Sequence, residues 1–444
     1  MKYNKLLAAF LAASLTAACG TAMAADAVCL ARIAADTDGN GTEETAELWG
    51  TQLTGGSSYY GNLLLMIKDE GGKLITAYTP SLEGGYANLL QKGHFTGKGE
   101  QLVVRSLSGG DSAMQVRVID AALPDAVQEI YSGSDNNGIN IEAKLQSGFK
   151  AVLDFPAVKS GGAWDTETVA LPENNSYYTD SGLYDENGSL LKPWQRPQEK
   201  MSGVTVVHGK DGAMDSLVTL QQVSVPGSGD TLAKIAGSWE YDNGWQLKDR
   251  EFYSQIVQNE EFRRNLVFGN GMLYKQQAVL DGSSVTYPLM AVEGKLELQN
   301  AINGELQKVW QPYADALGNT SCELDYTAPF AGQEMISLVF FGVMGEGEEE
   351  MFERLPLNIE LDTGKVLEIS DVLDTENPDL LPVLALLGAE DKVDFTKEVP
   401  PSWYYNGKNL VFCQKMKDGS GWNEAAVPVA ELEKFMLNKD FFKK

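Results

Sequence analysis

The sequence predicts a two-part fold, an all-β repeat region followed by an α+β region, and three observations indicate it. Short runs rich in Val, Ile, Leu and Tyr fill residues 27–253, and clusters of Gly, Asn, Asp and Ser separate them, a pattern typical of strands and turns. Long helical periodicity is absent there. After Tyr253 the pattern changes, because apolar residues recur at spacings of three and four between Leu296 and Leu317, as on an amphipathic helix.

The first region contains a repeated glycine-bearing turn. Gly41 and Gly99 are 58 positions apart, and Gly212 follows after 113, close to twice that distance. A repeat of roughly 57 residues that holds about four short strands has the size of one propeller blade. A further turn is expected near 155–162. The strand candidates in this region include Val28 to Ala34, Asn62 to Ile67, Leu102 to Ser106 and Met114 to Ile119.

These turns resemble those of the FG-GAP and VCBS class of propeller-like repeats. The segments are Asp36 to Glu44, His94 to Gln101 and His208 to Asp215. In that class a strand enters an acidic, glycine-bearing loop and leaves into a second strand. The resemblance implies a partial or distorted propeller over residues 25–253.

The second region, 254–444, mixes helices and strands and is predicted to be α+β. A charged, helix-like segment opens it and a closing helix ends it. The expected elements are a helix at 254–265, a hairpin of 272–279 and 284–288, a helix at 296–317, strands at 336–341, 357–361 and 410–414, and a helix at 429–437.

Four motifs of this region resemble the RsiV-like extracellular domain. They are Val285 to Pro288 with the helix that follows, Glu334 to Phe340, Leu357 to Leu373 with its Asp-Thr-Gly-Lys turn, and Trp403 to Leu432. The family includes an anti-sigma factor that senses lysozyme and a domain attached to peptidoglycan deacetylases. The family's Gly-Gly-Ala-His segment is replaced here by Met344 to Glu350, without a histidine. No sigma-binding segment accompanies the motifs, so the anti-sigma function is not carried over.

Residues 1–24 are predicted to be a cleavable signal peptide. Lys2 and Lys5 precede an apolar run too short to remain as a membrane span, and Ala22 and Ala24 give a signal peptidase site. The alternative is a lipoprotein site at Cys19, although the branched residue stands one position too early for it. Export to the periplasm or the extracellular space is therefore expected, with no transmembrane segment after cleavage.

The charge balance excludes one class of partner. The chain has 35 basic and 62 acidic residues, so it repels phosphate backbones, and nucleic acid is not expected to bind. Such a chain attracts cationic proteins and divalent cations, although acidity also serves solubility.

Cys29, Cys322 and Cys413 form no disulfide framework. Pairing of Cys322 with Cys413 and three buried thiols are the two interpretations.

The first turn is the candidate metal site, and calcium is the candidate ion. Asp36, Asp38, Asn40, the carbonyl of Thr42, and Glu44 would supply the oxygen ligands that calcium prefers. The spacing from Asp36 to Glu47 also fits the EF-hand expression, but strands rather than helices flank it. An ordinary acidic hairpin turn is the alternative, because Asp-Gly and Asn-Gly favour such turns.

A glycine-spaced acidic loop is the candidate partner-binding site. It contains Glu346, Glu348, Glu349 and Glu350. A solvated face is the simpler interpretation, and paired carboxylates also serve glycoside hydrolysis.

The aromatic cluster Trp403, Tyr404 and Tyr405 suits either core packing or partner contact.

The sequence therefore predicts an envelope-associated binding protein rather than an enzyme, with a cationic protein such as lysozyme as its partner. With only two histidines, His94 and His208, and no nucleophile elbow, a catalytic site is not expected. A cell-wall-directed hydrolase that uses acidic residues and a purely structural envelope module are the alternatives.

Overall fold

The computed structural model describes most of the chain from Ala27 to Phe442. The predicted signal peptide and the acidic positions Glu346 and Glu348 to Glu350 lie outside the described residues, so both remain predictions. The described residues are 27–52, 59–108, 113–131, 138–156, 164–171, 176–228, 230–254, 266–268, 271–292, 295–345, 351–388, 393–416 and 421–442.

The chain divides into two compact units, and each is considered by itself. The first comprises residues 1–264 and 277–282, and the second comprises 265–276 and 283–444. The main division thus falls after residue 264, where the sequence analysis placed a boundary after residue 253.

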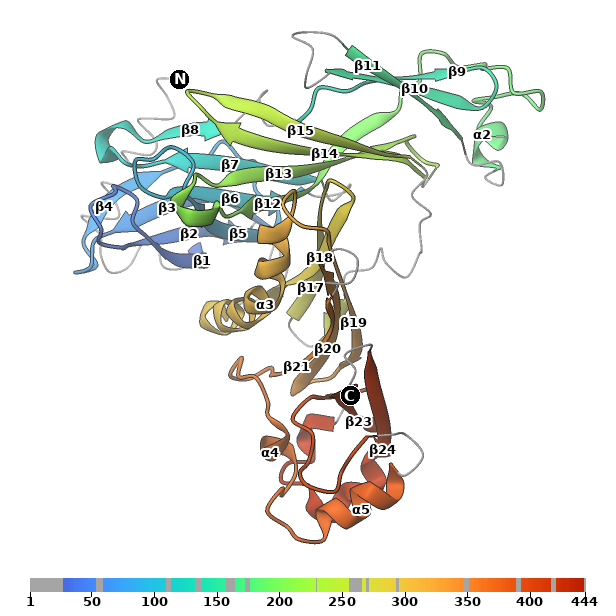
Figure 1. The fold of residues 1–444 in the computed structure, drawn as a ribbon. Coiled ribbons are helices and arrows are strands. Elements are labelled where there is room, and N and C mark those ends of the chain that lie inside the picture. Colours follow the sequence, from blue (N-terminus) through green and yellow to red (C-terminus); the bar gives the residue numbers. More distant parts are fainter. Residues whose placement is uncertain are drawn as a thin grey trace. The chain divides into compact units, whose positions relative to one another are not determined.

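The first unit is built from separate antiparallel sheets, in each of which the strand order follows the chain (Figure 1). The sheets are β1-β2-β3-β4, β5-β6-β7-β8, β9-β10-β11 and β12-β13-β14-β15. Their strands are β1 (Ala27–Ala35), β2 (Glu44–Gln52), β3 (Tyr60–Lys68), β4 (Leu74–Tyr78), β5 (Tyr86–Gly93), β6 (Gln101–Leu107), β7 (Met114–Asp120), β8 (Gln128–Tyr131), β9 (Glu142–Gln146), β10 (Lys150–Pro156), β11 (Trp164–Ala170), β12 (Gln198–Val207), β13 (Ser216–Ser224), β14 (Thr231–Tyr241) and β15 (Trp245–Ser254). The short helices of this unit are η1 (Pro124–Ala126), α2 (Tyr177–Asp180) and η3 (Lys210–Gly212).

The sheets of the first unit begin at regular intervals. Their first strands start at residues 27, 86, 142 and 198, so successive sheets start 59, 56 and 56 residues apart. This spacing agrees with the predicted repeat of roughly 57 residues. Of the turn expected near 155–162, Phe155 and Pro156 belong to β10, and residues 157–162 lie outside the described part of the chain. In this third sheet a tight turn at 147–149 joins the first two strands.

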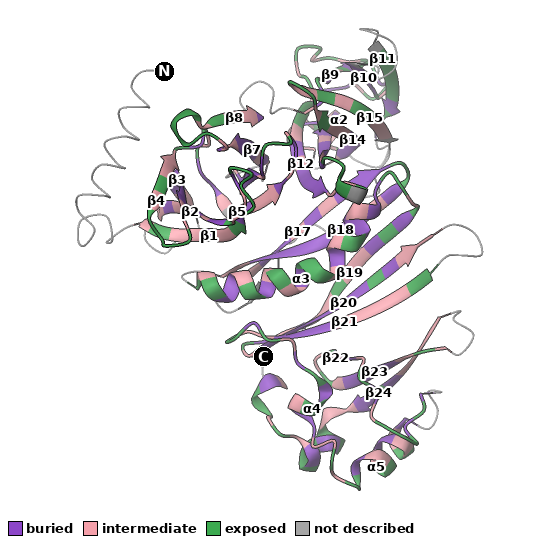
Figure 2. Cartoon of the chain, turned by 60° about the vertical axis from the view of Figure 1, so that its left-hand side comes forward, coloured by how far each residue is buried: buried purple, intermediate pink, exposed green. Residues whose placement is uncertain are grey.

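Buried apolar residues form clusters that pairs of sheets share (Figure 2). One cluster contains Leu65 of β3 and Leu102 of β6, and another contains Phe155 of β10 and Ile235 of β14. Side chains alternate between the faces of a strand, so every second residue reaches such a cluster. Paired sheets of this kind occur in sandwiches as well as in propellers, and closure into a propeller therefore stays a prediction.

The second unit contains a six-stranded and a three-stranded sheet, except that residues 277–280, at the end of strand β17 of the larger sheet, are assigned to the first unit. Strands β18 and β19 are parallel, and helix α3 connects them, since parallel neighbours need a crossover connection. The orders are β16-β17-β18-β19-β20-β21 and β22-β23-β24. The elements are β16 (Leu266–Phe268), β17 (Gly271–Leu280), β18 (Ser283–Val292), α3 (Leu296–Ala316), β19 (Cys322–Ala331), β20 (Met335–Met344), β21 (Met351–Glu360), α4 (Ile369–Val372), α5 (Leu380–Leu387), β22 (Trp403–Tyr405), β23 (Asn409–Lys415), β24 (Trp422–Pro428), η6 (Val429–Phe435) and η7 (Asp440–Phe442).

The predicted amphipathic helix is confirmed as α3. Its apolar positions Ile302, Leu306 and Trp310 are buried, and the Trp310 ring stacks on Tyr287 with 4.1 Å between the ring centroids. The hairpin and the three central strands predicted here are present. The closing helix is shorter than expected and is the 3₁₀ helix η6, while residues 255–265 lie outside the described part of the chain.

The core of the smaller sheet settles the role of the aromatic cluster. Trp403 and Tyr405 are 2% and 5% exposed and pack with α4, α5 and η6. The half-buried Tyr404 donates a hydrogen bond to Glu424 over 3.1 Å. Core packing is therefore the main role of this cluster.

Two of the three cysteines, Cys322 and Cys413, are buried thiols, and Cys29 is half-buried. Cys322 and Cys413 are both buried and free, so the disulfide considered between them is absent, and Cys29 is free as well. Burial raises the pKa of the Cys413 thiol to about 12 and that of Cys29 to about 11.

In the described part of the chain, no helix is long and apolar enough to cross a membrane.

Candidate calcium loop and the adjoining loop network

The loop between β1 and β2 folds around its own carboxylates. One oxygen of Asp36 accepts a hydrogen bond from the backbone N–H of Asn40, and the other accepts one from Gly41, both over 3.0 Å. Asp38 also accepts from the Asn40 N–H over 3.0 Å. Gly41 has a φ of 87°, a conformation that glycine adopts without steric cost. The Asp-x-Asp-x-Asn-Gly spacing therefore draws both aspartates into one tight turn.

Three of the predicted ligands come together. One carboxylate oxygen from each of Asp36, Asp38 and Glu44 lies within 4.8 Å of the others. Calcium takes six to eight oxygen ligands, and Asn40 and Thr42 of the same loop carry further oxygens. The donor set is composed of oxygen alone, which fits calcium rather than zinc or copper.

Glu44 closes the loop. Its side chain is buried, and its Oε2 accepts hydrogen bonds from the Thr37 N–H over 2.8 Å and the Thr37 hydroxyl over 2.7 Å. Among the described residues, Oε1 of Glu44 has no hydrogen-bond donor. One oxygen of this carboxylate therefore holds the turn, and the other is available to an ion.

Glu47, the last position of the EF-hand spacing, does not belong to the loop. It lies in β2, buried, and forms ion pairs with Arg32 over 3.0 Å and with Lys68 over 2.6 Å. Burial raises its pKa, but hydrogen bonds from Lys68 and Trp49 outweigh that effect and hold the pKa below its ordinary value. Glu47 is thus a paired structural carboxylate.

The two sister loops close in the same way. In the loop between β5 and β6, Gln101 accepts hydrogen bonds from the backbone N–H groups of Phe95 and Thr96 over 2.8 and 3.1 Å. In the loop between β12 and β13, Asp215 accepts from the Gly209 N–H over 3.0 Å. Each closing residue stands at or just before the start of the second strand, as Glu44 does. The repeat is therefore a repeat of hydrogen bonding as well as of sequence.

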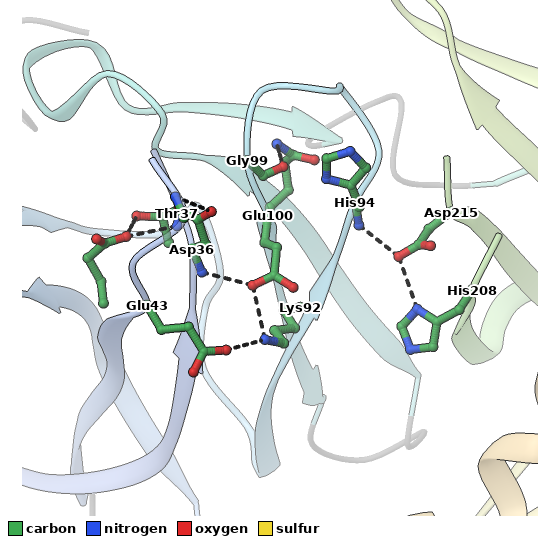
Figure 3. A network of polar contacts seen from close by, with 12 residues as sticks. Asp36, Thr37, Glu43, Lys92, His94, Gly99, Glu100, His208 and Asp215 are labelled. Carbon is green, nitrogen blue, oxygen red and sulfur yellow. Dashed lines mark hydrogen bonds and ion pairs between the residues drawn. The ribbon is translucent and has the colours of Figure 1, made fainter. Parts of the chain in front are cut away.

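The first loop is bound to the second (Figure 3). The Asp36 N–H donates to Glu100 over 2.8 Å, and the Glu100 N–H donates to the Asp36 carbonyl over 2.7 Å. Lys92 forms ion pairs with Glu43 over 2.9 Å and with Glu100 over 3.0 Å. A Cβ added to Gly99 would lie 2.8 Å from the backbone N of Gly39. The two loops therefore pack backbone to backbone.

The second loop is bound to that of the fourth sheet through Asp215 (Figure 3). One oxygen of Asp215 accepts from the His94 N–H over 2.7 Å and contacts the His208 ring over 3.0 Å. The Asp215 N–H donates to the His94 carbonyl over 2.8 Å. Burial raises the pKa of Asp215, but the hydrogen bonds from His208, His94 and Gly209 outweigh that effect and hold the pKa below its ordinary value.

Sequence reasoning missed this network, although the residues stood in the repeated turns. Glu100 and Asp36 are 64 positions apart, and Asp215 and His94 are 121 apart. A repeat of turns shows that the loops are alike. It does not show that they touch.

In the second unit, exposed apolar side chains occur in β20 and β21, the strands that precede and follow the acidic positions in the sequence. Met351 and Phe352 of β21 are 55% and 44% exposed, and Phe341 of β20 is 38% exposed. The Arg354 guanidinium lies 5.0 Å from the centre of the Phe341 ring and forms an ion pair with Glu424. The end of this hairpin, residues 341–344 and 351–354, thus combines aromatic, apolar and cationic groups.

Together these features define a multidomain, mainly β protein with a repeated loop closure and one acidic loop. The family model of the YybI C-terminal domain matches residues 139–253. That segment begins just before β9 and ends in β15, so it spans the third and fourth sheets. It lies N-terminal to the region in which the RsiV-like motifs occur.

Solved structures provide the second comparison. A DUF3298-family protein from Bacteroides fragilis is 12% identical and has a TM-score of 0.28, and the match covers 39% of this chain and 94% of that one. A DUF3298-family protein from Pseudomonas aeruginosa is 11% identical at a TM-score of 0.30, over 39% and 96%. A rhamnogalacturonan lyase is 14% identical at a TM-score of 0.29, over 92% and 60%. None of the curated proteins matches the chain.

The match to the YybI C-terminal domain model bears out a resemblance to the RsiV-like family, over residues 139–253, and is compatible with an envelope-associated extracellular domain. At these identities and TM-scores the structural likenesses carry nothing about activity, and the lyase's substrate is not transferred to this chain.

Proposed function

We propose that this chain is an exported, envelope-associated binding protein and not an enzyme. Its first unit holds one calcium ion in the β1–β2 loop, and its second unit binds a cationic protein, for which lysozyme is the first probe. The observation that carries the calcium part is the convergence of Asp36, Asp38 and Glu44. Like charges so close together repel each other, and a bound cation removes that repulsion.

Calcium is expected to stabilise the folded chain, since a ligand that binds only the folded state raises the melting temperature. A calcium titration followed by circular dichroism should show that rise in the wild type. The double substitution Asp36→Ala with Asp38→Ala should abolish it.

The chain offers a matched control for this experiment. Asp185 also caps a turn, by accepting hydrogen bonds from the N–H groups of Asn187 and Ser189 over 2.9 and 2.7 Å. Asp185→Ala should leave the calcium response unchanged. If the wild type shows no shift in millimolar calcium, the loop is an ordinary acidic turn.

The partner proposal is supported by charge and by the hairpin end. The chain carries a net charge of −27, and complementary charge speeds association with a cationic protein. Phenylalanines such as Phe341 and Phe352 are enriched at protein interfaces, and arginines such as Arg354 are frequent hot spots there. The acidic loop supplies the steering charge and the hairpin end supplies the apolar contact.

Calorimetric titration of the full chain with lysozyme, at low and moderate salt, tests the partner proposal. Binding should persist at moderate salt, where exposed charges are screened beyond about 8 Å. Phe352→Ser should weaken it roughly 30-fold if this ring is a hot spot worth about 2 kcal/mol.

Replacement of Glu348, Glu349 and Glu350 by Gln should slow association and leave dissociation nearly unchanged. Phe341→Ser is a second hairpin variant, and Leu191→Ser, at an exposed position of the first unit, is the control. Heat that vanishes at moderate salt would mean nonspecific charge attraction and would end the lysozyme proposal.

A further inference from the structure

A cavity of about 460 Å³ lies beside the candidate calcium loop, within the first unit. Its size falls in the usual range for small-molecule sites, roughly 300 to 1,000 Å³. Three segments line it: the β1–β2 loop, the β5–β6 loop and the connection between β7 and β8. The calcium proposal uses Asp38 alone among its polar side chains.

The walls of the cavity are built before any ligand arrives. Two hydrogen bonds between Asp36 and Glu100 join the first two loops: the Asp36 N–H donates to the Glu100 carboxylate, and the Glu100 N–H donates to the Asp36 carbonyl. The third wall is fixed to the first sheet, because the Thr76 hydroxyl donates to the carbonyl of Pro124 over 3.1 Å. Asp120 accepts from the Ala122 N–H over 3.0 Å, which orients its carboxylate. Little conformational entropy is therefore lost when a ligand binds.

The lining combines hydrogen-bond acceptors, donors and one apolar surface. Asp38 and Asp120 accept, while Lys98 and the amide of Gln128 donate. Lys98 has no ion-pair partner in the described part of the chain, so its ammonium is available. Leu123 is 68% exposed and lines the same cavity.

We infer that this cavity binds a neutral saccharide. A sugar ring presents hydroxyl groups that both donate and accept, together with an apolar face, and the lining offers a partner for each. With no calcium bound, Asp38 and Asp120 outnumber the single ammonium of Lys98, so an anionic sugar is disfavoured by like charge in the calcium-free protein. The inference does not rest on calcium, because Asp120, Lys98, Gln128 and Leu123 lie outside the set of proposed metal ligands.

Calorimetric titration of the full chain with cellobiose, chitobiose and digalacturonate tests the inference. At least one neutral disaccharide should bind, and digalacturonate should bind more weakly. Asp120→Asn should weaken binding about 10-fold, because a hydrogen bond to a charged group contributes that much, while an asparagine still accepts from Ala122. Leu123→Ser should weaken binding several-fold through the loss of apolar contact.

Glu186→Gln is the matched control, since Glu186 is an exposed carboxylate in the turn after α2. It should leave binding unchanged. The affinities for the neutral disaccharides should be the same in chelator, which separates this site from the calcium proposal, and the comparison with digalacturonate is made in chelator. Failure of both neutral disaccharides to bind at millimolar concentration would overturn the inference. Stronger binding of digalacturonate, or unchanged binding in both cavity variants, would do so as well.

Discussion

At the residue scale, Asp215 is the group that joins the loop of the second sheet to that of the fourth. It is 6% exposed and accepts hydrogen bonds from the N–H groups of His94 and Gly209 as well as contacting the ring of His208. A buried carboxylate is costly unless it is paired and hydrogen-bonded. The donor His94 follows β5 of the second sheet, and Gly209 lies in the loop of the fourth sheet. The cost of burying the carboxylate is therefore offset only when these two loops are in contact.

Asp215→Asn is expected to lower the free energy of unfolding by about 1 to 3 kcal/mol, because the amide cannot accept from every donor and leaves one unpaired. The folded-state pKa of Asp215 is lowered, so its contribution is complete above the unfolded pKa of about 3.9 and is lost as the pH falls through the folded value. Urea unfolding of wild type and variant should therefore differ near neutral pH and converge in acid. Glu186→Gln is the control. A constant difference across the pH range would contradict the role assigned to Asp215.

At the element scale, the packing of one loop on the next depends on a glycine that the repeat alone does not single out. Gly99 has a φ of 102°, and an added Cβ would lie 2.8 Å from the backbone N of Gly39 and the carbonyl of Thr37. Gly41 has a similar φ of 87°, but an added Cβ would meet nothing within 4 Å. A side chain at either position would strain the backbone because φ is positive. Only at Gly99 would its Cβ also collide with the neighbouring loop.

Gly99→Ala is therefore expected to destabilise the chain by about 2 to 4 kcal/mol, from left-handed strain plus displacement of backbone. Gly41→Ala should cost about 1 to 2 kcal/mol from strain alone. Thermal denaturation of both variants measures the difference. Equal losses would show that the loops do not pack as closely as the distances indicate.

At the scale of the whole molecule, the two compact units should unfold as separate transitions. Each has its own buried core, which is the requirement for independent folding. Differential scanning calorimetry is expected to show two transitions, of which calcium raises only the one that belongs to the first unit. A fragment from Ser254 to Lys444 should reproduce the other. A single transition that calcium shifts to higher temperature would mean that the two units unfold together, which would contradict this prediction.

The sequence by itself determined the local features of this protein. Apolar periodicity located α3 to within one residue of its end, and the spacing of Gly41, Gly99 and Gly212 predicted the interval at which sheets begin. The Asp-x-Asp-x-Asn-Gly run indicated the turn that gathers Asp36 and Asp38. These features depend on neighbours along the chain, which is the information that periodicity and turn chemistry carry.

Only the tertiary structure decided which distant groups meet. It paired Glu47, the last position of the EF-hand spacing, with Arg32 and Lys68. It also left Cys322 and Cys413 unpaired and joined Asp215 to His94 across 121 positions. The physical reason is that burial and long-range hydrogen bonds follow from how sheets stack, and a turn has the same local pattern whether or not another loop packs against it.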